Sequence, residues 1–334
     1  MPTLRSSLPV RGRQLVVAGL AALVCSTALV TVSAPPADAR PSKQLFGIQD
    51  QSTPGMFDDP LLRALRPQTA RYLTDWKTAL SPGSGRDQLD AWYRAAVRTH
   101  VRPLISFQHF VSLEGYRAGR QIKPPSSRAF RTAFRAFLTR YPRARDYAVW
   151  NEANHFTQPL YKHPKDAARL AHVARATCPR CTIVGLTLVN GDRTSSIRYA
   201  KTYWKGLTRA DRKRMVWGIH NYADVNHHRT TNLRFFLKTF PTGDVWLTES
   251  SAFAQYLSND LRYSASGKRQ ATSTKETFAA ATTFRSRVKR LYWYQWRGTA
   301  DRDPGIVWDT GLLDSDGTPR AAYRVALRER GRMR

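Results

Sequence analysis

The chain has 334 residues and a formal net charge of +30, from 54 lysines and arginines against 24 aspartates and glutamates. Its length leaves room for one large α/β barrel or two ordinary domains and excludes neither. The charge predicts an attraction to polyanions that fades with salt, but it does not identify a partner, and a basic surface without any dedicated polyanion site is an equal alternative.

Residues 1–39 have the pattern of a secretory signal peptide. Three arginines precede an uncharged, largely apolar run at residues 15–32, and the triplet Ala-Asp-Ala follows at residues 37–39. We therefore expect cleavage after Ala39 and a secreted or cell-wall-associated protein with no membrane segment. The run is also long enough to span a bilayer, so an uncleaved anchor is the alternative.

Eight short apolar segments follow, most of them about 30 to 45 residues apart, which suits strands joined through helices. We expect these strands at residues 45–50, 69–74, 102–107, 147–152, 182–187, 216–221, 245–250 and 291–296.

The segments between the strands have helical periodicity. Within residues 126–141 aromatic side chains recur at intervals of three and four, at Phe130, Phe134, Phe137 and Tyr141. Arginines occupy other positions, so this stripe is expected to pack in the core and not to bind a cofactor. Similar patterns at residues 87–100 and 163–177 predict two more helices.

The alternation of strands and helices predicts an α/β protein with a single (β/α)₈ TIM barrel at residues 40–334, because no long Gly/Ser-rich or Pro-rich linker divides this range. A doubly wound open sheet is the second choice. In a barrel the functional residues come from the carboxyl ends of the strands.

Two predicted strands carry a glutamate at this end. Glu152 follows Asn151 after an apolar run, and Glu249 lies in the seventh strand. A carboxylate is costly to bury unless it is paired or used. Two carboxyl groups at one barrel mouth are what glycoside hydrolysis needs, since one donates a proton and the other acts as nucleophile or base. Structural pairing with the abundant arginines is the alternative.

Other strand ends add polar and aromatic candidates. Arg71 lies in the second strand, His220 and Tyr222 follow the sixth, and Trp296 ends the eighth. A flat indole can contact the face of a sugar ring. Each has a structural alternative: an ion pair for Arg71, a satisfied core position for His220 and barrel filling for Trp296.

At these positions the sequence resembles the clan of retaining (β/α)₈ glycoside hydrolases that carry catalytic glutamates after strands four and seven, in particular the β-xylosidase and α-iduronidase-like family and its bacterial exopolysaccharide-hydrolase relatives. The segment WNEAN at residues 150–154 resembles their W-N-E-P-N motif, and WLTES at residues 246–250 resembles their nucleophile strand. Ala153 stands where the motif has proline.

The resemblance covers almost all of residues 40–334 in the order of elements, and it implies Glu152 as general acid/base and Glu249 as nucleophile. It also implies Asn151 as donor to the sugar 2-hydroxyl.

Three further residues receive roles from the same resemblance. Arg71 and Tyr222 would hold the nucleophile ionised, and His220 would line the donor site. Trp296 would form the floor beneath the sugar ring.

Two cysteines remain after residue 39, Cys178 and Cys181. A C-x-x-C pair can be a redox centre, half of a zinc site or a small disulfide loop. With no second cysteine pair and an oxidising compartment expected, we favour a structural disulfide.

The segment from His220 to His228 also contains Asp224 and His227, which suggests a metal site. The intervals do not match a helical H-x-x-x-H arrangement, so no metal or other cofactor is predicted.

The function predicted from the sequence is therefore that of a monomeric, secreted retaining glycosidase whose partner is a carbohydrate substrate. A non-catalytic carbohydrate-binding barrel and a polyanion-binding or nuclease-like basic protein are the alternatives. No phosphate-cradling glycine loop is present, so no specific nucleic acid is expected.

Overall fold

The structure is a computed structural model of the chain. It describes residues 43–51, 54–109, 123–189, 193–257, 262–298 and 307–333. The predicted signal peptide at residues 1–39 lies outside the described residues and stays a prediction. Among the helices of the described ranges, none is long and apolar enough to cross a lipid bilayer.

Eight parallel strands close into a barrel in the order β1-β10-β7-β6-β5-β4-β3-β2, within one compact unit at residues 41–334. The barrel strands are β1 (Leu45–Gln49), β2 (Thr69–Asp75), β3 (Arg102–Gln108), β4 (Asp146–Ala148), β5 (Thr182–Val189), β6 (Val216–His220), β7 (Asp244–Ser250) and β10 (Val288–Tyr294). Each overlaps one of the predicted strands, so the single-domain (β/α)₈ barrel is confirmed.

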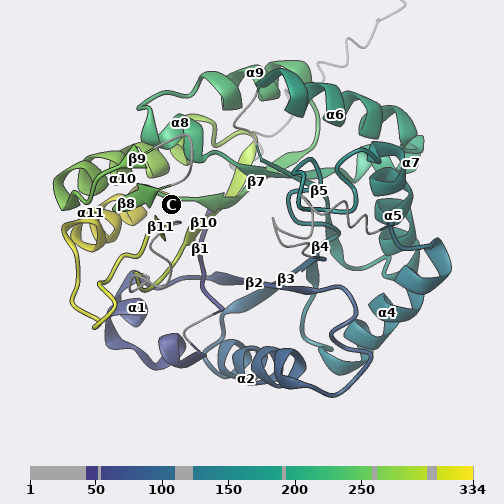
Figure 1. The fold of residues 1–334 in the computed structure, drawn as a ribbon, viewed down its shortest axis with the longest axis horizontal. Coiled ribbons are helices and arrows are strands. Elements are labelled where there is room, and N and C mark those ends of the chain that lie inside the picture. The colour runs from purple at the N-terminus through teal and green to yellow at the C-terminus, as the bar shows by residue number, and fades with distance from the viewer. Residues whose placement is uncertain are drawn as a thin grey trace, which may run out of the picture. The chain divides into compact units, whose positions relative to one another are not determined.

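Helices surround the strands (Figure 1). They are η1 (Pro54–Asp58), α1 (Pro60–Leu65), α2 (Ser84–Arg98), α4 (Ser127–Arg140), α5 (Pro164–Thr177), α6 (Arg193–Gly206), α7 (Arg209–Lys213), α8 (Tyr222–Asn226), α9 (Thr231–Thr239), α10 (Gly267–Thr283), α11 (Ala321–Glu329) and η2 (Arg330–Met333). A small second sheet follows the order β11-β8-β9, from β8 (Gln255–Leu257), β9 (Arg262–Tyr263) and β11 (Val307–Asp309). This sheet was not predicted.

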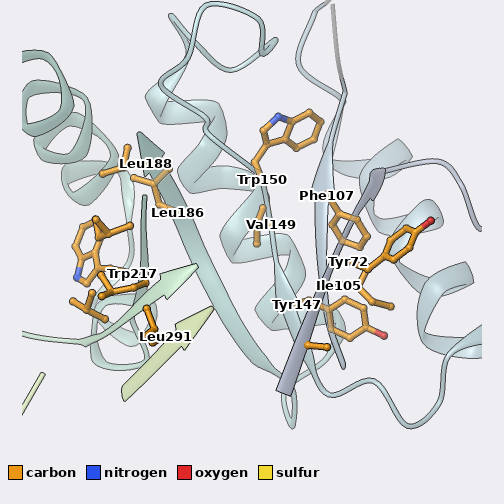
Figure 2. Close-up of a cluster of buried hydrophobic side chains, with 14 of the residues drawn as sticks. Tyr72, Ile105, Phe107, Tyr147, Val149, Trp150, Leu186, Leu188, Trp217 and Leu291 are labelled. Carbon is orange, nitrogen blue, oxygen red and sulfur yellow. The ribbon is translucent and has the colours of Figure 1, made fainter. Parts of the chain in front are cut away.

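The aromatic stripe of α4 lies against β3, as predicted. Ser126 caps the helix by accepting a hydrogen bond from the Ala129 amide at 3.2 Å. The α4 rings at positions 130, 134 and 137 lie 6.0, 5.9 and 4.7 Å from the ring of Phe107, centroid to centroid. Tyr147 of β4 lies beside Phe107 at 6.0 Å (Figure 2). This packing fixes β3 and β4 next to each other at the site where β4 ends.

Three predicted strand ends differ from the structure by two residues or more. Strand β5 continues to Val189, two residues beyond the predicted end. Strand β4 ends at Ala148 and not at residue 152, because amides two residues apart, which face the same neighbour in a regular strand, bond to opposite neighbours beyond Ala148. The Asn151 amide donates to the Phe107 carbonyl at 2.6 Å, and the Ala153 amide donates to the Thr187 carbonyl at 3.1 Å. Strand β10 ends at Tyr294, two residues before the predicted end.

The barrel interior contains apolar side chains at its middle and a charged network toward the amino-terminal end. Asp146 is completely buried, and its carboxylate lies 2.6 Å from nitrogens of both Arg102 and Arg290. The Arg290 guanidinium stacks on Trp246 at 3.5 Å from the ring centroid. The network therefore ties β3, β4, β7 and β10 together inside the barrel.

Cys178 and Cys181 form a disulfide, as favoured from the sequence. It lies between the end of α5 and the start of β5.

The Asp146 network generates a stability prediction. Asp146→Asn keeps the volume of the side chain but leaves the buried Arg290 without its counter-charge, so the free energy of unfolding should fall by about 3 kcal/mol. Urea denaturation measures the loss. The matched control is Asp244→Asn at the exposed start of β7, which should change stability by less than about 0.5 kcal/mol. Equal losses in the two variants would contradict a specific role for Asp146.

Candidate active site

Four barrel strands, β2, β4, β6 and β7, and the turns that follow them bring the predicted site residues together, with one exception. Strands β2, β6 and β7 supply Arg71, His220 and Glu249, and in the register of the sheet His220 pairs with Glu249. Tyr222 begins helix α8 directly after β6. Polar side chains that follow apolar strands can reach one cavity here because parallel strands all end at the same barrel rim.

Glu152 reaches the site from the turn after β4. Its backbone has φ +43°, in the left-handed region that costs a non-glycine residue about 1–3 kcal/mol. The flanking amides of Asn151 and Ala153 are held by carbonyls of β3 and β5, respectively. The surrounding sheet therefore determines this turn, and the turn directs the carboxyl group of Glu152 toward β6 and β7.

The carboxylate of Glu249 is almost fully buried and accepts hydrogen bonds from three side chains. Arg71 Nη1 donates to Oε1 at 2.5 Å, and Gln49 Nε2 donates to the same oxygen at 3.3 Å. Tyr222 Oη donates to Oε2 at 3.0 Å. These contacts fix both oxygens of the carboxylate.

Arg71 connects the acid to its surroundings. Its side chain is completely buried. Nη1 also donates to Gln49 Oε1, whereas Nη2 donates to Ser106 Oγ at 2.9 Å and to Asn151 Oδ1 at 2.6 Å. Because Arg71 holds Oδ1 of Asn151, the amide nitrogen of Asn151 is oriented away from it as a donor.

The pKa of Glu249 follows from opposing effects. Burial alone would raise it, but the electrostatic attraction of His220 and Arg71 outweighs burial, aided by hydrogen bonds from Arg71 and Tyr222, so the pKa is lowered. Burial and the charge of Glu249 raise the pKa of Tyr222 well above its usual value. Glu249 is therefore held as a carboxylate, and Tyr222 remains a neutral donor.

The two glutamates face each other across His220. His220 Nδ1 lies 2.8 Å from Glu152 Oε1 and 3.5 Å from Glu249 Oε2. One ligand-type atom from each of the three residues lies within 4.8 Å of the other two. Glu152 is the more accessible acid, with 24% of its side chain exposed against 8% for Glu249.

These three side chains are also the group that could hold a metal ion among the described residues. A divalent cation there would share Glu249 with the Arg71 guanidinium, which already lies 2.5 Å from Oε1. Two positive charges at one carboxylate oppose each other, so the arrangement suits proton transfer better than metal binding.

Trp296 is the exception among the predicted site residues, and its assignment as the floor of a sugar site is wrong for this structure. The side chain is fully buried. Its indole Nε1 donates to Asp59 Oδ2 at 3.1 Å, and its ring packs on Tyr323 with centroids 6.1 Å apart. No face of the indole is open to a ligand.

Tyr294 lies at the end of β10 in the position expected for Trp296. Burial and the negative charges of Glu249, Asp50 and Glu152 raise its pKa, which places its hydroxyl in the electrostatic field of the site. In a strand that continued to residue 296, Tyr294 and Trp296 would point to the same side, but β10 ends at Tyr294. The sequence therefore indicated an aromatic side chain facing this way, but it did not show where the strand ends.

Gln49 and Ser106 were also missing from the predicted site. Both are polar positions within otherwise apolar strands, β1 and β3, and both hydrogen-bond to Arg71. Their side chains accept hydrogen bonds from the Nη groups of the guanidinium inside the barrel.

The remaining residues of the histidine-rich segment do not converge on a metal site. Asp224 accepts backbone N–H bonds from Asn232 at 3.1 Å and Leu233 at 2.8 Å, in the first turn of α9. The other two histidines of the segment contact different partners, Tyr263 for His227 and Ser273 for His228.

No protein-family model matches the sequence, and no curated protein matches it. Solved structures share the fold. A family 5 (GH5_18) protein from Streptomyces cattleya, solved with GlcNAc, has a TM-score of 0.61 and 18% identity over 87% of this chain and 80% of its own. A fungal β-1,4-galactanase has a TM-score of 0.62 and 16% identity over 86% of this chain and 100% of its own.

A family 39 glycoside hydrolase from Bacteroides cellulosilyticus has a TM-score of 0.58 and 16% identity over 86% of this chain. The chain spans 63% of the length of that protein. At these identities the similarity shows the (β/α)₈ fold.

The lowered pKa of Glu249 makes the stability of the protein depend on pH in a defined direction. A carboxyl group with a depressed pKa in the folded state adds stability above its unfolded pKa of about 4.3, and this stability is lost as pH falls through the folded pKa. Wild type should therefore be more stable than Glu249→Gln at pH 7. The difference should shrink below about pH 4.3. Urea denaturation of both proteins between pH 7 and pH 3 measures it, and a difference that grows toward acid pH would contradict the lowered pKa.

Proposed function

We propose that this protein is a retaining glycoside hydrolase in which Glu249 is the nucleophile and Glu152 is the general acid/base. One observation carries the proposal: oxygens of the two carboxyl groups lie within 4.8 Å of each other. This agrees with the roughly 5–5.5 Å of retaining enzymes better than with the roughly 6.5–9.5 Å that inverting enzymes need for a water molecule. The structurally similar proteins, which are glycoside hydrolases, support the same class.

The two acids have different surroundings. Glu249 is almost fully buried, and Arg71 holds it as a carboxylate, which is the form that can attack the anomeric carbon. Glu152 is more accessible and hydrogen-bonds His220. In the first step Glu249 attacks the anomeric carbon, the glycosidic bond breaks, and the proton of Glu152 goes to the leaving oxygen.

In the second step the roles change. The ester formed by Glu249 carries no charge, so Glu152, now a carboxylate, takes a proton from water. The resulting hydroxide attacks the anomeric carbon from the side that the leaving group vacated, and Glu249 departs as a carboxylate. Two inversions give net retention.

The other polar groups support this cycle. The Asn151 amide, held through its oxygen by Arg71, directs its N–H toward the place of the sugar 2-hydroxyl beside the nucleophile. The Tyr222 hydroxyl donates a hydrogen bond to Glu249 while Glu249 is charged, and this hydrogen bond can break when the ester forms. Tyr294, at the end of β10, is the aromatic side chain that we propose beside the sugar in place of Trp296.

Secretion after cleavage behind Ala39 is part of the same proposal, on the sequence pattern alone. A monomeric state is the default that goes with it. A carbohydrate-binding barrel without catalysis is less well supported, because it has no need for two acids that face each other.

The central test is a glycan panel with wild type, Glu249→Ala and Glu152→Ala. The acid/base variant should lose roughly a hundredfold to ten-thousandfold in kcat, and the nucleophile variant should lose at least as much. Azide should restore turnover of Glu249→Ala and give a glycosyl azide of inverted configuration, because azide enters from the side of the missing carboxylate. NMR of the product identifies the anomer. Glu276→Ala, on the outer helix α10, is the control and should keep wild-type turnover. Full activity of either active-site variant would exclude the assignment.

Tyr222→Phe gives a prediction about pH. The variant loses a hydrogen bond that lowers the pKa of Glu249, so that pKa should rise and the acidic limb of the kcat/KM profile should move to higher pH. At the optimum, kcat/KM should fall about tenfold to a hundredfold, as expected for a hydrogen bond to a charged group. An acidic limb that stays in place, or moves to lower pH, would show that Glu249 does not control it.

A further inference from the structure

Cationic residues mark the amino-terminal ends of the barrel strands, opposite the candidate active site. In seven of the eight strands a lysine or arginine lies at the first residue or within three residues before it. They are Lys43, Arg66, Arg102, Arg145, Arg180, Arg214 and Arg287, before or at the start of β1, β2, β3, β4, β5, β6 and β10. Strand β7 is the exception, because it begins with Asp244.

Three cavities open at this end, and each is lined by three cations. A cavity of about 230 Å³ at the starts of β1 and β2 is lined by Lys43, Arg66 and Arg330. A second of about 340 Å³, at the starts of β6 and β7, is lined by Lys213, Arg214 and Arg287. A third of about 270 Å³, at the start of β5, is lined by Arg175, Arg180 and Arg214.

The cavities follow consecutive strands of the barrel. The order β5-β6-β7-β10-β1-β2 is continuous around the ring, and Arg214 lines both the second and the third cavity. Neighbouring strands lie about 4.8 Å apart, so the cations form an arc with short spacing and not isolated charges.

Most of these cations lack a counter-charge. Within the described residues, the exposed side chains of Lys43, Arg66, Arg180 and Lys213 form no ion pair. Among the residues that line the three cavities, the one acid is Asp244, in the second cavity. Like charges within about 10 Å repel each other at moderate salt. A bound polyanion would remove this repulsion.

Arg175 adds a buried donor to the third cavity. Its side chain is only 4% exposed, and its Nε and Nη1 have no hydrogen-bond partner. Asp211 lies 3.6 Å from Nη1, which compensates the charge but makes no hydrogen bond. Arg175 therefore contributes a buried and largely compensated positive charge to the wall of this cavity.

Acidic side chains occur at the opposite end of the barrel. Asp50, Asp75, Glu152 and Glu249 lie at or after the carboxyl ends of their strands. Glu249 is five residues beyond Asp244 along β7, which separates the two ends by about 16 Å. The cations of the three cavities therefore lie well apart from the acids of the candidate active site.

We propose that the amino-terminal end of the barrel is a binding site for a linear anionic polysaccharide. Carboxylate or sulfate groups along the polymer occupy the three cavities, where guanidinium groups bind such anions through paired N–H donors. The polymer binds the amino-terminal end of the barrel, and the candidate active site at the carboxyl ends of the strands stays open.

The lining favours a polysaccharide over nucleic acid. Single-stranded nucleic acids bind by stacking bases on aromatic side chains along a basic groove. Neither tyrosine nor tryptophan lines any of the three cavities, and the one phenylalanine, Phe46, is buried. Charge recognition without stacking is what an acidic glycan needs.

The test compares two triple variants with the same change in net charge. Lys43→Glu/Arg180→Glu/Lys213→Glu reverses one exposed cation in each cavity. Arg128→Glu/Arg131→Glu/Arg135→Glu reverses three exposed cations on the outer face of helix α4. The dissociation constant for polygalacturonate is measured by fluorescence titration from about 50 mM to 200 mM salt, and circular dichroism confirms that both variants fold.

The cavity variant should bind roughly thirtyfold more weakly at low salt, and its salt dependence should be shallower by about two to three in log–log slope, as for the loss of three ionic contacts. The α4 variant should stay close to wild type. Equal weakening in both variants would show that only net charge matters and would overturn the proposal. So would wild-type binding to a single-stranded or duplex oligonucleotide that is tighter than binding to polygalacturonate. Neither readout involves hydrolysis, so the result is independent of the proposed enzymatic function.

Discussion

The ion pair between Arg71 and Glu249 is the constraint on which the candidate site depends. Two charges removed from water are held more favourably when further hydrogen bonds satisfy their other polar groups. Here Gln49, Ser106 and Asn151 accept hydrogen bonds from the two Nη groups of Arg71. The arginine thus sets the charge state of one acid and, through Asn151, links it to the turn that carries the other acid. Strands β1, β2, β3 and β7 are joined by this one group.

Buried arginines have different roles at the two ends of the barrel. Near the amino-terminal end, Arg290 and Arg102 pair with the buried Asp146, and the pairing fastens the strands. At the carboxyl end one buried arginine, Arg71, holds Glu249 as a carboxylate. Further cations line the cavities at the amino-terminal end, away from the acids of the candidate site. The composition gives only the net charge of the chain, whereas the fold determines where the individual charges lie.

Much of the fold and site could be predicted because the evidence is local. An apolar run that ends in a polar residue identifies a strand and its functional end together, and this was enough for Glu152, Glu249 and His220. The strand end of β10 was harder: Trp296 and Tyr294 share one alternation, and only the tertiary contacts of Trp296 with Asp59 and Tyr323 decide which lies at the rim. The sheet of β8, β9 and β11 was not predictable, since strands of two or three residues have no measurable periodicity. The arc of cations comes from residues spread over the whole chain, so only closure of the barrel reveals it.

The left-handed backbone at Glu152 places folding and activity in opposition at a single residue. Glycine adopts this conformation without a steric penalty, and asparagine does so more easily than glutamate. A chain selected for durability alone would drift toward those residues at this turn, and with them it would lose the carboxyl group. Keeping an acid here thus gives up some robustness, which neighbouring strands offset by holding the turn from both sides.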